Sequence, residues 1–455
     1  MRPLTLLLSL VALAPAAGAR DTNVADCGAR GDGRTLDTAA VQKAIDDCHA
    51  SGGGTVDFPT GRFLSGTLTL KSNVTLHLTP GAVLLGSTRL ADYGPKKHLL
   101  FADGVENIAI TGGGVIDGQG DAFFDKDMKP LERLAQLIEI ENSHGVRLEG
   151  VTVRQSGNWT FRVRNCDDVK IRGVSMLNNV RAVNTDGLQI SSSRNVIIAD
   201  CHIEGGDDCI VLKTDNDPAD GPVENVTVTN CLLVSAACAL KFGTGTYQDF
   251  RHCVFSNCVI RDSRTGIALM MKDGGTIEDV HFSNITITTR PKWGQGLEWP
   301  IVIDIERRTN ESKLGRIRDV SFDGITVYSK GRILAEGMPG RPIEGLSFRN
   351  VVLRVGGYEK IEGGKKPRGG PHGASDDSPD FGAAPAAFIF THVKGLELDG
   401  VTLVWPETAA DVDAPVRHAV LGVHLAGVRL TGFRGAASRP EIRALEFRES
   451  TGIEP

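Results

Sequence analysis

Three aspartates in two neighbouring segments of the chain could perform acid–base chemistry together. Asp186 lies in the segment Val-Asn-Thr-Asp-Gly-Leu, and Asp207 and Asp208 lie in the segment Gly-Gly-Asp-Asp-Cys-Ile. Each segment leads into an alternation of apolar residues, and aligning the two alternations places Asp186 beside Asp208. If the alternations are neighbouring strands, the two backbones are about 4.8 Å apart. The sequence therefore predicts that three carboxyl groups converge on one face.

Such a cluster suits the hydrolysis of a glycosidic bond. Carboxylates this close repel one another, so the pKa of at least one of them rises and that group keeps a proton. Glycoside hydrolysis needs one protonated carboxyl group for the leaving oxygen and one carboxylate to activate water. Two other interpretations stay open. Aspartates also serve in turns, as we expect for Asp323 and Asp399, and converging carboxylates can hold a calcium ion.

The elements that would position these aspartates form a repeat. Each repeat has alternating apolar residues, then Asn, Asp or Gly, then a second apolar alternation. The repeats begin at Val146, Val169, Val196, Val226, Cys253, Val280, Val320, Leu346 and Leu396. Alternation is the period of a strand with one buried face, and Asn, Asp and Gly tolerate the left-handed backbone of a tight turn. Most repeats are 23 to 30 residues apart, which is typical of a parallel β-helix.

We therefore predict an all-β protein, a right-handed single-stranded parallel β-helix with a short N-terminal capping helix. An antiparallel sandwich is disfavoured because the turns lack hairpin signals of the Asn-Gly type. Residues 38–48 have an amphipathic helical pattern, with Val41, Ala44 and Ile45 on one face. A helix of this kind can cover the open apolar end of a solenoid.

The chain begins with a candidate export signal. One basic residue, a short apolar run and three small residues predict a signal peptide over residues 1–19, and the run is too short to span a bilayer. We expect a secreted or periplasmic protein whose residues 20–455 form one β-helix domain, with long insertions near 286–318 and 355–385. The net charge of −6 argues against nucleic acid or an anionic membrane as a partner, and we expect a monomer.

The cysteines fit a core better than a scaffold of disulfides. There are nine, an odd number, and none forms a pair with zinc-site spacing. Cys27 and Cys48 bracket an N-terminal segment and could form a disulfide in an oxidising compartment. Four others share one position of the repeat, where we expect buried thiols: Cys166, Cys201, Cys231 and Cys258. We predict no metal ion and no cofactor.

At the acidic segments the sequence resembles glycoside hydrolase family 28, the polygalacturonase family. The Asn-Thr-Asp that ends at Asp186 and the Gly-Asp-Asp that ends at Asp208 look like its first two signatures. The resemblance implies that Asp207 is the general acid, that Asp186 and Asp208 position and deprotonate a water, and that the anomeric carbon is inverted. An inverting enzyme is expected to hold its carboxyl groups roughly 6.5–9.5 Å apart. The implied substrate is a pectic polysaccharide or oligosaccharide.

Two further signatures of that family are absent. Ala-Cys-Ala at 237–239 stands where the family has Gly-His-Gly, and Ala-Leu-Met at 268–270 stands where it has Arg-Ile-Lys. The missing basic pair normally binds a galacturonate carboxylate, so plain homogalacturonan becomes a less suitable substrate. Lys241 alternates with core residues and should face outward beside the aspartates, and Lys213 and Lys272 could add charge there.

Candidate substrate-binding residues surround the aspartates. Met270, Trp293 and Trp299 would suit a less charged sugar such as rhamnose, although tryptophans can equally pack an insertion. The complete set is Asn184, Gln189, Lys213, Lys241, Met270, Lys272, Trp293 and Trp299. We therefore predict an inverting hydrolase of a galacturonan or rhamnogalacturonan. The alternatives are a calcium-dependent lyase of the pectate-lyase type and a carbohydrate-binding β-helix without catalysis.

Overall fold

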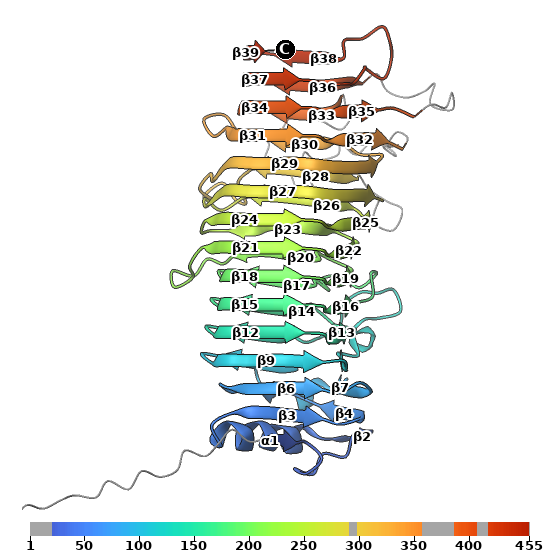
Figure 1. Cartoon of the computed structure of the whole chain (residues 1–455), viewed down its shortest axis with the longest axis vertical. Coiled ribbons are helices and arrows are strands. Elements are labelled where there is room, and N and C mark those ends of the chain that lie inside the picture. Colours follow the sequence, from blue (N-terminus) through green and yellow to red (C-terminus); the bar gives the residue numbers. More distant parts are fainter. Residues whose placement is uncertain (1–20, 291–297, 357–385, 407–416, 455) are drawn as a thin grey trace, which may run out of the picture.

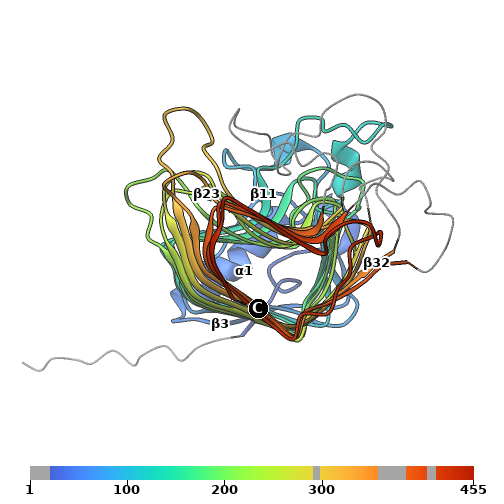
Figure 2. The same cartoon turned by 90° about the horizontal axis from the view of Figure 1, so that it is seen from above.

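The computed structural model describes residues 21–290, 298–356, 386–406 and 417–454. Its strands stack as successive coils along one axis (Figure 1), and each strand pairs in parallel with its counterparts in the coils before and after. Viewed along that axis, the sides of the solenoid enclose a common interior (Figure 2). The prediction of a right-handed parallel β-helix is confirmed.

One sheet of thirteen strands carries the aspartates, and we call it the site sheet. Its strands are β5 (Leu68–Thr69), β8 (Leu100–Asp103), β11 (Gln136–Glu141), β14 (Trp159–Arg164), β17 (Leu188–Ser191), β20 (Ile210–Thr214), β23 (Cys238–Thr246), β26 (Thr265–Met271), β28 (Trp299–Ile305), β30 (Ile333–Glu336), β33 (Ala386–Thr391), β36 (His418–Val423) and β38 (Leu445–Arg448).

The remaining strands build the other sides of the coils. One run is β3 (Gly54–Phe58), β6 (Val74–Leu78), β9 (Glu106–Gly112), β12 (His144–Glu149), β15 (Asp167–Arg172), β18 (Arg194–Ala199), β21 (Val223–Thr229), β24 (Phe250–Ser256), β27 (Thr276–Thr289), β29 (Arg316–Ser329), β31 (Ile343–Arg349), β34 (Val393–Asp399), β37 (Ala426–Thr431) and β39 (Thr451–Glu454). The other run is β2 (Asp32–Leu36), β4 (Gly61–Ser65), β7 (Ala82–Gly86), β10 (Val115–Asp117), β13 (Thr152–Arg154), β16 (Ser175–Leu177), β19 (His202–Gly205), β22 (Leu232–Ser235), β25 (Val259–Ser263), β32 (Val352–Val355) and β35 (Thr402–Val404).

The turn position of the repeat has the left-handed backbone that the sequence predicted. The non-glycine residues there have φ between 51° and 59°: Asp200, Asn230, Asn257, Asn284 and Asn350. Their side chains also connect the coils, since Asn284 Nδ2 donates to Asn257 Oδ1 at 2.8 Å. These residue types therefore both permit the turn and link neighbouring turns.

Apolar side chains fill the interior in rows along the axis. The rings of Phe255, Phe282, Phe322 and Phe348 stack with centroids 4.8–4.9 Å apart. The four cysteines are buried, as predicted, but only Cys201, Cys231 and Cys258 share a position, after β18, β21 and β24, whereas Cys166 follows β14 of the site sheet. Cys27 and Cys48 are free thiols, so the disulfide that their spacing allowed is not formed.

The N-terminal end is covered by α1 (Thr38–Ala50), which lies below β3 in Figure 1. Its buried residues include Val41, Ala44 and Ile45, so the predicted capping helix and its apolar face are confirmed. Asp37 precedes this helix, and its carboxylate accepts hydrogen bonds from two backbone N–H groups at 2.8 and 3.0 Å.

The predicted insertions are only partly visible. Within the predicted insertion 286–318, the end of β27, all of β28 and the start of β29 belong to the coils, and the described residues 306–315 form a loop between β28 and β29. The segment 355–385 lies almost wholly outside the described residues, as does the predicted signal peptide. Within the described ranges, no helix combines the length and apolar character needed to cross a membrane.

Replacing Phe322 by alanine should lower the free energy of unfolding by about 3–5 kcal/mol, because it leaves a cavity in the aromatic row. Urea denaturation followed by circular dichroism measures this change. Tyr328→Ala is the matched control, since Tyr328 lies on the same strand but is 46% exposed, and its effect should be small. Equal losses in both variants would contradict the proposed role of the row.

Candidate active site

The three aspartates meet at the beginning of two neighbouring strands of the site sheet. Leu188 pairs with Ile210, as the alignment of apolar residues predicted, so Asp186 and Asp208 occupy adjacent coils. One carboxylate oxygen from each of the three aspartates lies within 4.8 Å of the others. Asp186 and Asp208 are buried, whereas Asp207 is half-buried.

Glycines in both segments allow the chain to pack this tightly. A Cβ on Gly187 would lie 2.5 Å from the carbonyl oxygen of Cys209, and one on Gly206 would lie 2.0 Å from that of Ala182. Both distances are too short for any side chain. The Gly187 N–H also donates to the Asp208 carbonyl at 2.8 Å, which joins the two acidic segments directly.

Two of the predicted lysines contact the aspartates. Lys241 Nζ lies 2.8 Å from Asp208 Oδ2, and Lys213 Nζ lies 3.4 Å from Asp186 Oδ2. Burial, the largest single cause, lowers the pKa of Lys241, but Asp208, Cys238 and Asp207 together raise it by more, and the net shift is upward. Lys241 therefore stays positively charged beside the Asp208 carboxyl group.

Asp186 has a strongly perturbed proton affinity. Burial is the main cause and, together with the charges of Asp207 and Asp208, raises its pKa to about 7, while Lys213 opposes the rise. A carboxyl group in this environment retains a proton that an exposed aspartate would lose. Because the three groups are coupled, that proton belongs to the cluster as a whole.

The polar residues predicted beside the aspartates also lie there. Asn184 Nδ2 is 3.4 Å from Asp207 Oδ2, and Gln189 Nε2 is 3.5 Å from Asp186 Oδ2. Three buried oxygens, Asp186 Oδ1, Asp208 Oδ1 and Gln189 Oε1, accept no hydrogen bond from the described part of the chain. Buried acceptors usually have donors, so these oxygens suit the O–H groups of a water or a sugar.

Three further residues at the site were missed by the sequence analysis. Arg133 Nη2 donates to Asn184 Oδ1 at 2.8 Å. The Trp159 ring contacts the Lys213 ammonium, 4.7 Å from its centroid, and the Arg162 guanidinium at 5.9 Å. The strand register could have placed Trp159, because Phe161 pairs with Leu188. Arg133 precedes β11 in an irregular segment that carried no periodic signal.

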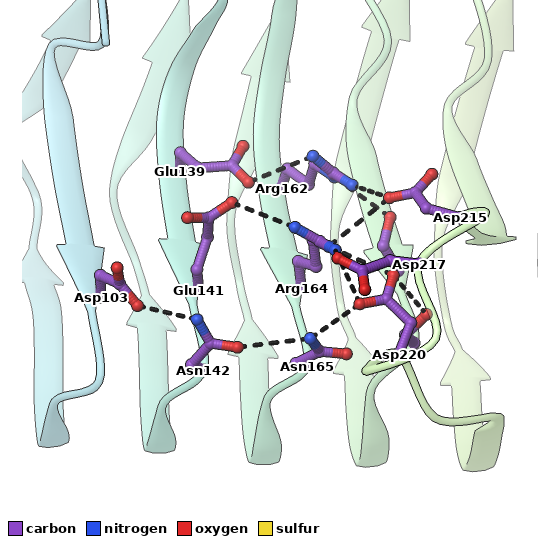
Figure 3. Close-up of polar contacts among 12 residues, drawn as sticks. Asp103, Glu139, Glu141, Asn142, Arg162, Arg164, Asn165, Asp215, Asp217 and Asp220 are labelled. Atoms are coloured by element: carbon purple, nitrogen blue, oxygen red, sulfur yellow. Dashed lines mark hydrogen bonds and ion pairs between the residues drawn. The ribbon is translucent and has the colours of Figure 1, made fainter.

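A network of charges fixes the loop 215–222 that follows β20. Arg162 and Arg164 project from β14 toward Asp215, Asp217 and Asp220 of this loop (Figure 3). Arg164 Nη2 lies 2.7 Å from both Asp217 Oδ2 and Asp220 Oδ1. The loop is therefore anchored to the site sheet next to Lys213.

Several predicted substrate contacts do not fit the structure. Met270 is 1% exposed and Trp299 is 3% exposed, because both pack in an apolar cluster with Ala268, Val302 and other residues of the site sheet. Lys272 is buried in an ion pair with Glu306 and does not contact the aspartates. Trp293 lies outside the described residues.

The distances also correct the expected spacing of the carboxyl groups. The 4.8 Å limit that contains one oxygen of each aspartate is shorter than the roughly 6.5–9.5 Å expected for inversion. A calcium ion would require six to eight oxygen ligands, typically about 2.3–2.6 Å away. Lysines already contact two of the three carboxylates, so the cluster fits calcium poorly.

Known proteins resemble this chain in sequence and fold. A probable polygalacturonase from Vitis vinifera is 27% identical over 376 residues, covering 75% of this chain and 76% of that protein. An exopolygalacturonase from Zea mays is 28% identical over 331 residues, covering 67% and 76%. The structure of an exopolygalacturonase from Thermotoga maritima superposes with a TM-score of 0.67 at 22% identity, covering 85% of this chain and 92% of that one.

The family model described as glycosyl hydrolases family 28 matches residues 48–367. This range is more than half of the chain and includes the three aspartates and the lysines that contact them. The chain therefore belongs to glycosyl hydrolases family 28 and is a glycoside hydrolase.

Proposed function

We propose that this enzyme hydrolyses a glycosidic bond in a pectin-type backbone, using Asp186, Asp207 and Asp208. The observation that carries the proposal is the cluster of three carboxyl groups, in which the pKa of Asp186 is raised to about 7 and the Lys241 ammonium contacts Asp208. Relatives named polygalacturonase and exopolygalacturonase support a pectic substrate. We also propose that residues 1–19 direct export and that the enzyme acts as a secreted or periplasmic monomer.

In the proposed mechanism Asp207 protonates the leaving oxygen. Asp207 is the least buried of the three, so a glycosidic oxygen can reach it most easily. Asp186 Oδ1 and Asp208 Oδ1 can accept hydrogen bonds from a water, orient it toward the anomeric carbon and receive its proton. The water attacks from the face opposite to the breaking C–O bond. The cluster gives one proton to the leaving oxygen and receives one from the water, so its total number of protons is unchanged. By this route the anomeric carbon is inverted, as the resemblance to family 28 implies, although the carboxyl oxygens lie closer together than the separation typical of inverting enzymes.

The substrate that we propose is a galacturonate-containing backbone, either galacturonan or rhamnogalacturonan. Lys213 lies between Asp186 and the Trp159 ring, which places a positive charge and an aromatic surface near the cleaved bond. The burial of Met270 and Trp299 removes their support for rhamnose. A calcium-dependent lyase is disfavoured because lysines occupy the positions next to two of the carboxylates.

The products from defined pectic oligosaccharides test the reaction type. Hydrolysis should give saturated products whose new reducing ends first appear as the inverted anomer in proton NMR, and a chelator should leave the rate unchanged. These results follow if water attacks directly without a metal ion. An unsaturated uronide product, or loss of activity in chelator, would instead identify a lyase.

Asp207→Asn should lower kcat by at least 10²-fold while changing the melting temperature little, because it removes the proton donor without altering the packing. The loss should be smaller on an aryl galacturonide, since its acidic leaving group needs less protonation. Asp323→Asn, at an exposed position of β29 away from the aspartate cluster, is the control and should retain activity. A large fall in melting temperature would mark Asp207 as structural.

Lys213→Met should move the alkaline limb of the kcat/KM–pH profile to higher pH. The cluster needs its proton to act, and activity falls as the proton is lost near the raised pKa of Asp186, about 7. Lys213 lowers that pKa, so its removal raises the pKa further and the proton is kept to higher pH. Lys170→Met is the control, since exposed Lys170 pairs with Asp168 elsewhere. An unmoved or acid-shifted limb would refute the assignment.

A further inference from the structure

A hollow lies on a different edge of the solenoid from the aspartates. It has a volume of about 670 Å³, within the ~300–1,000 Å³ of ordinary ligand pockets. We call it the basic pocket, and its lining residues are Gly274, Thr276, Arg307, Glu311, Ser312, Lys313, Leu314, Arg316, Pro339, Gly340 and Arg341. The aspartates precede strands of the site sheet, whereas these residues follow β26, β28 and β30.

Positive charge dominates this pocket although the whole chain has a net charge of −6. Its lining contains four cationic side chains, Arg307, Lys313, Arg316 and Arg341, and one carboxylate, Glu311. The four cations come from the loop after β28, the first residue of β29 and the turn before β31. All four side chains are exposed, so an anion can reach them from solvent.

These cations differ from their neighbours in lacking an acidic partner. Arg318, two residues along β29, has its Nε 2.7 Å from Glu278 Oε2 and also pairs in register with Glu344. Arg316 pairs in register with Thr276, which carries no charge. Among the described residues, no carboxylate forms an ion pair with any of the pocket's four cations.

The walls of the pocket are held in place by contacts outside it. Arg308 Nε lies 2.7 Å from Asp273 Oδ1, which anchors the loop that carries Arg307. On the other wall, Met338 and Arg341 exchange two backbone hydrogen bonds of 2.8 and 3.0 Å. The cations are thus presented by fixed backbone, which reduces the entropy lost when a ligand binds.

We propose that the basic pocket binds the carboxylates of an oligogalacturonate segment, at a site separate from the catalytic aspartates. Arginine guanidinium groups match the planar geometry of carboxylates, and four cations from three segments of the chain can bind more than one carboxylate. The choice of a uronate as the anion rests on the proposed function. A polymer held here remains near the enzyme between cleavage events, which raises its local concentration at the aspartates.

Titration calorimetry with tetragalacturonate tests the pocket. The parent protein is Asp207→Asn, in which the ligand should stay intact, and the added change is Arg316→Gln with Arg341→Gln. We expect two binding events in the parent, and we expect the double change to weaken one of them at least tenfold. Added sodium chloride should also weaken that event, because the cations are exposed.

Arg318→Gln in the same background is the matched control, since this arginine lies on the same strand outside the pocket, and both events should persist. The proposal is overturned if the double change leaves both affinities for tetragalacturonate unchanged. It is also overturned if sulfate, compared at equal ionic strength, displaces tetragalacturonate from the pocket, because the pocket would then bind any anion. If the unmodified enzyme cleaves no pectic substrate while binding still depends on Arg316 and Arg341, the hydrolase proposal fails and the pocket remains.

Discussion

The parallel pairing of β17 with β20 is the constraint on which the active site depends. It places Asp186 and Asp208 on adjacent coils, where the charge of Asp208 repels that of Asp186. This repulsion adds to the effect of burial, which is the main reason that the pKa of Asp186 is raised. The repulsion is tolerable because Lys213 and Lys241 contact these same two groups. The backbone hydrogen bonds between the two strands thus determine how close the charged groups of the site lie to one another.

Much of this arrangement could be predicted from the sequence because strand alternation and turn residues obey local rules. The Asn, Asp and Gly positions of the repeat fixed the turns, and the apolar alternation fixed the register of Leu188 with Ile210. From that register followed the convergence of the aspartates and the outward position of Lys241. These inferences need only the period of a strand and the fact that each coil packs on the next.

The incorrect predictions of substrate-binding residues concern a part of the site sheet whose outer face is covered by other side chains and does not face solvent. Met270 alternates outward along β26, but an apolar cluster that also contains Trp299 buries it there, and strand periodicity cannot distinguish a covered outer face from an open one. Arg133 was missed because irregular segments have no period. The basic pocket depends on the meeting of three segments that are distant in sequence, which no local pattern reveals.

The direct backbone link between the acidic segments limits how such an enzyme can evolve. The N–H of Gly187 donates to the carbonyl of Asp208, and the coil between Asp186 and Asp207 pairs with its neighbours along β18 and β19. Inserting a single residue within one of those strands would turn the later side chains of that strand to the opposite face. The length of a loop outside the strands has no such restriction, so we expect lineages to diversify in such loops, while the length of the coil between the acidic segments stays constant.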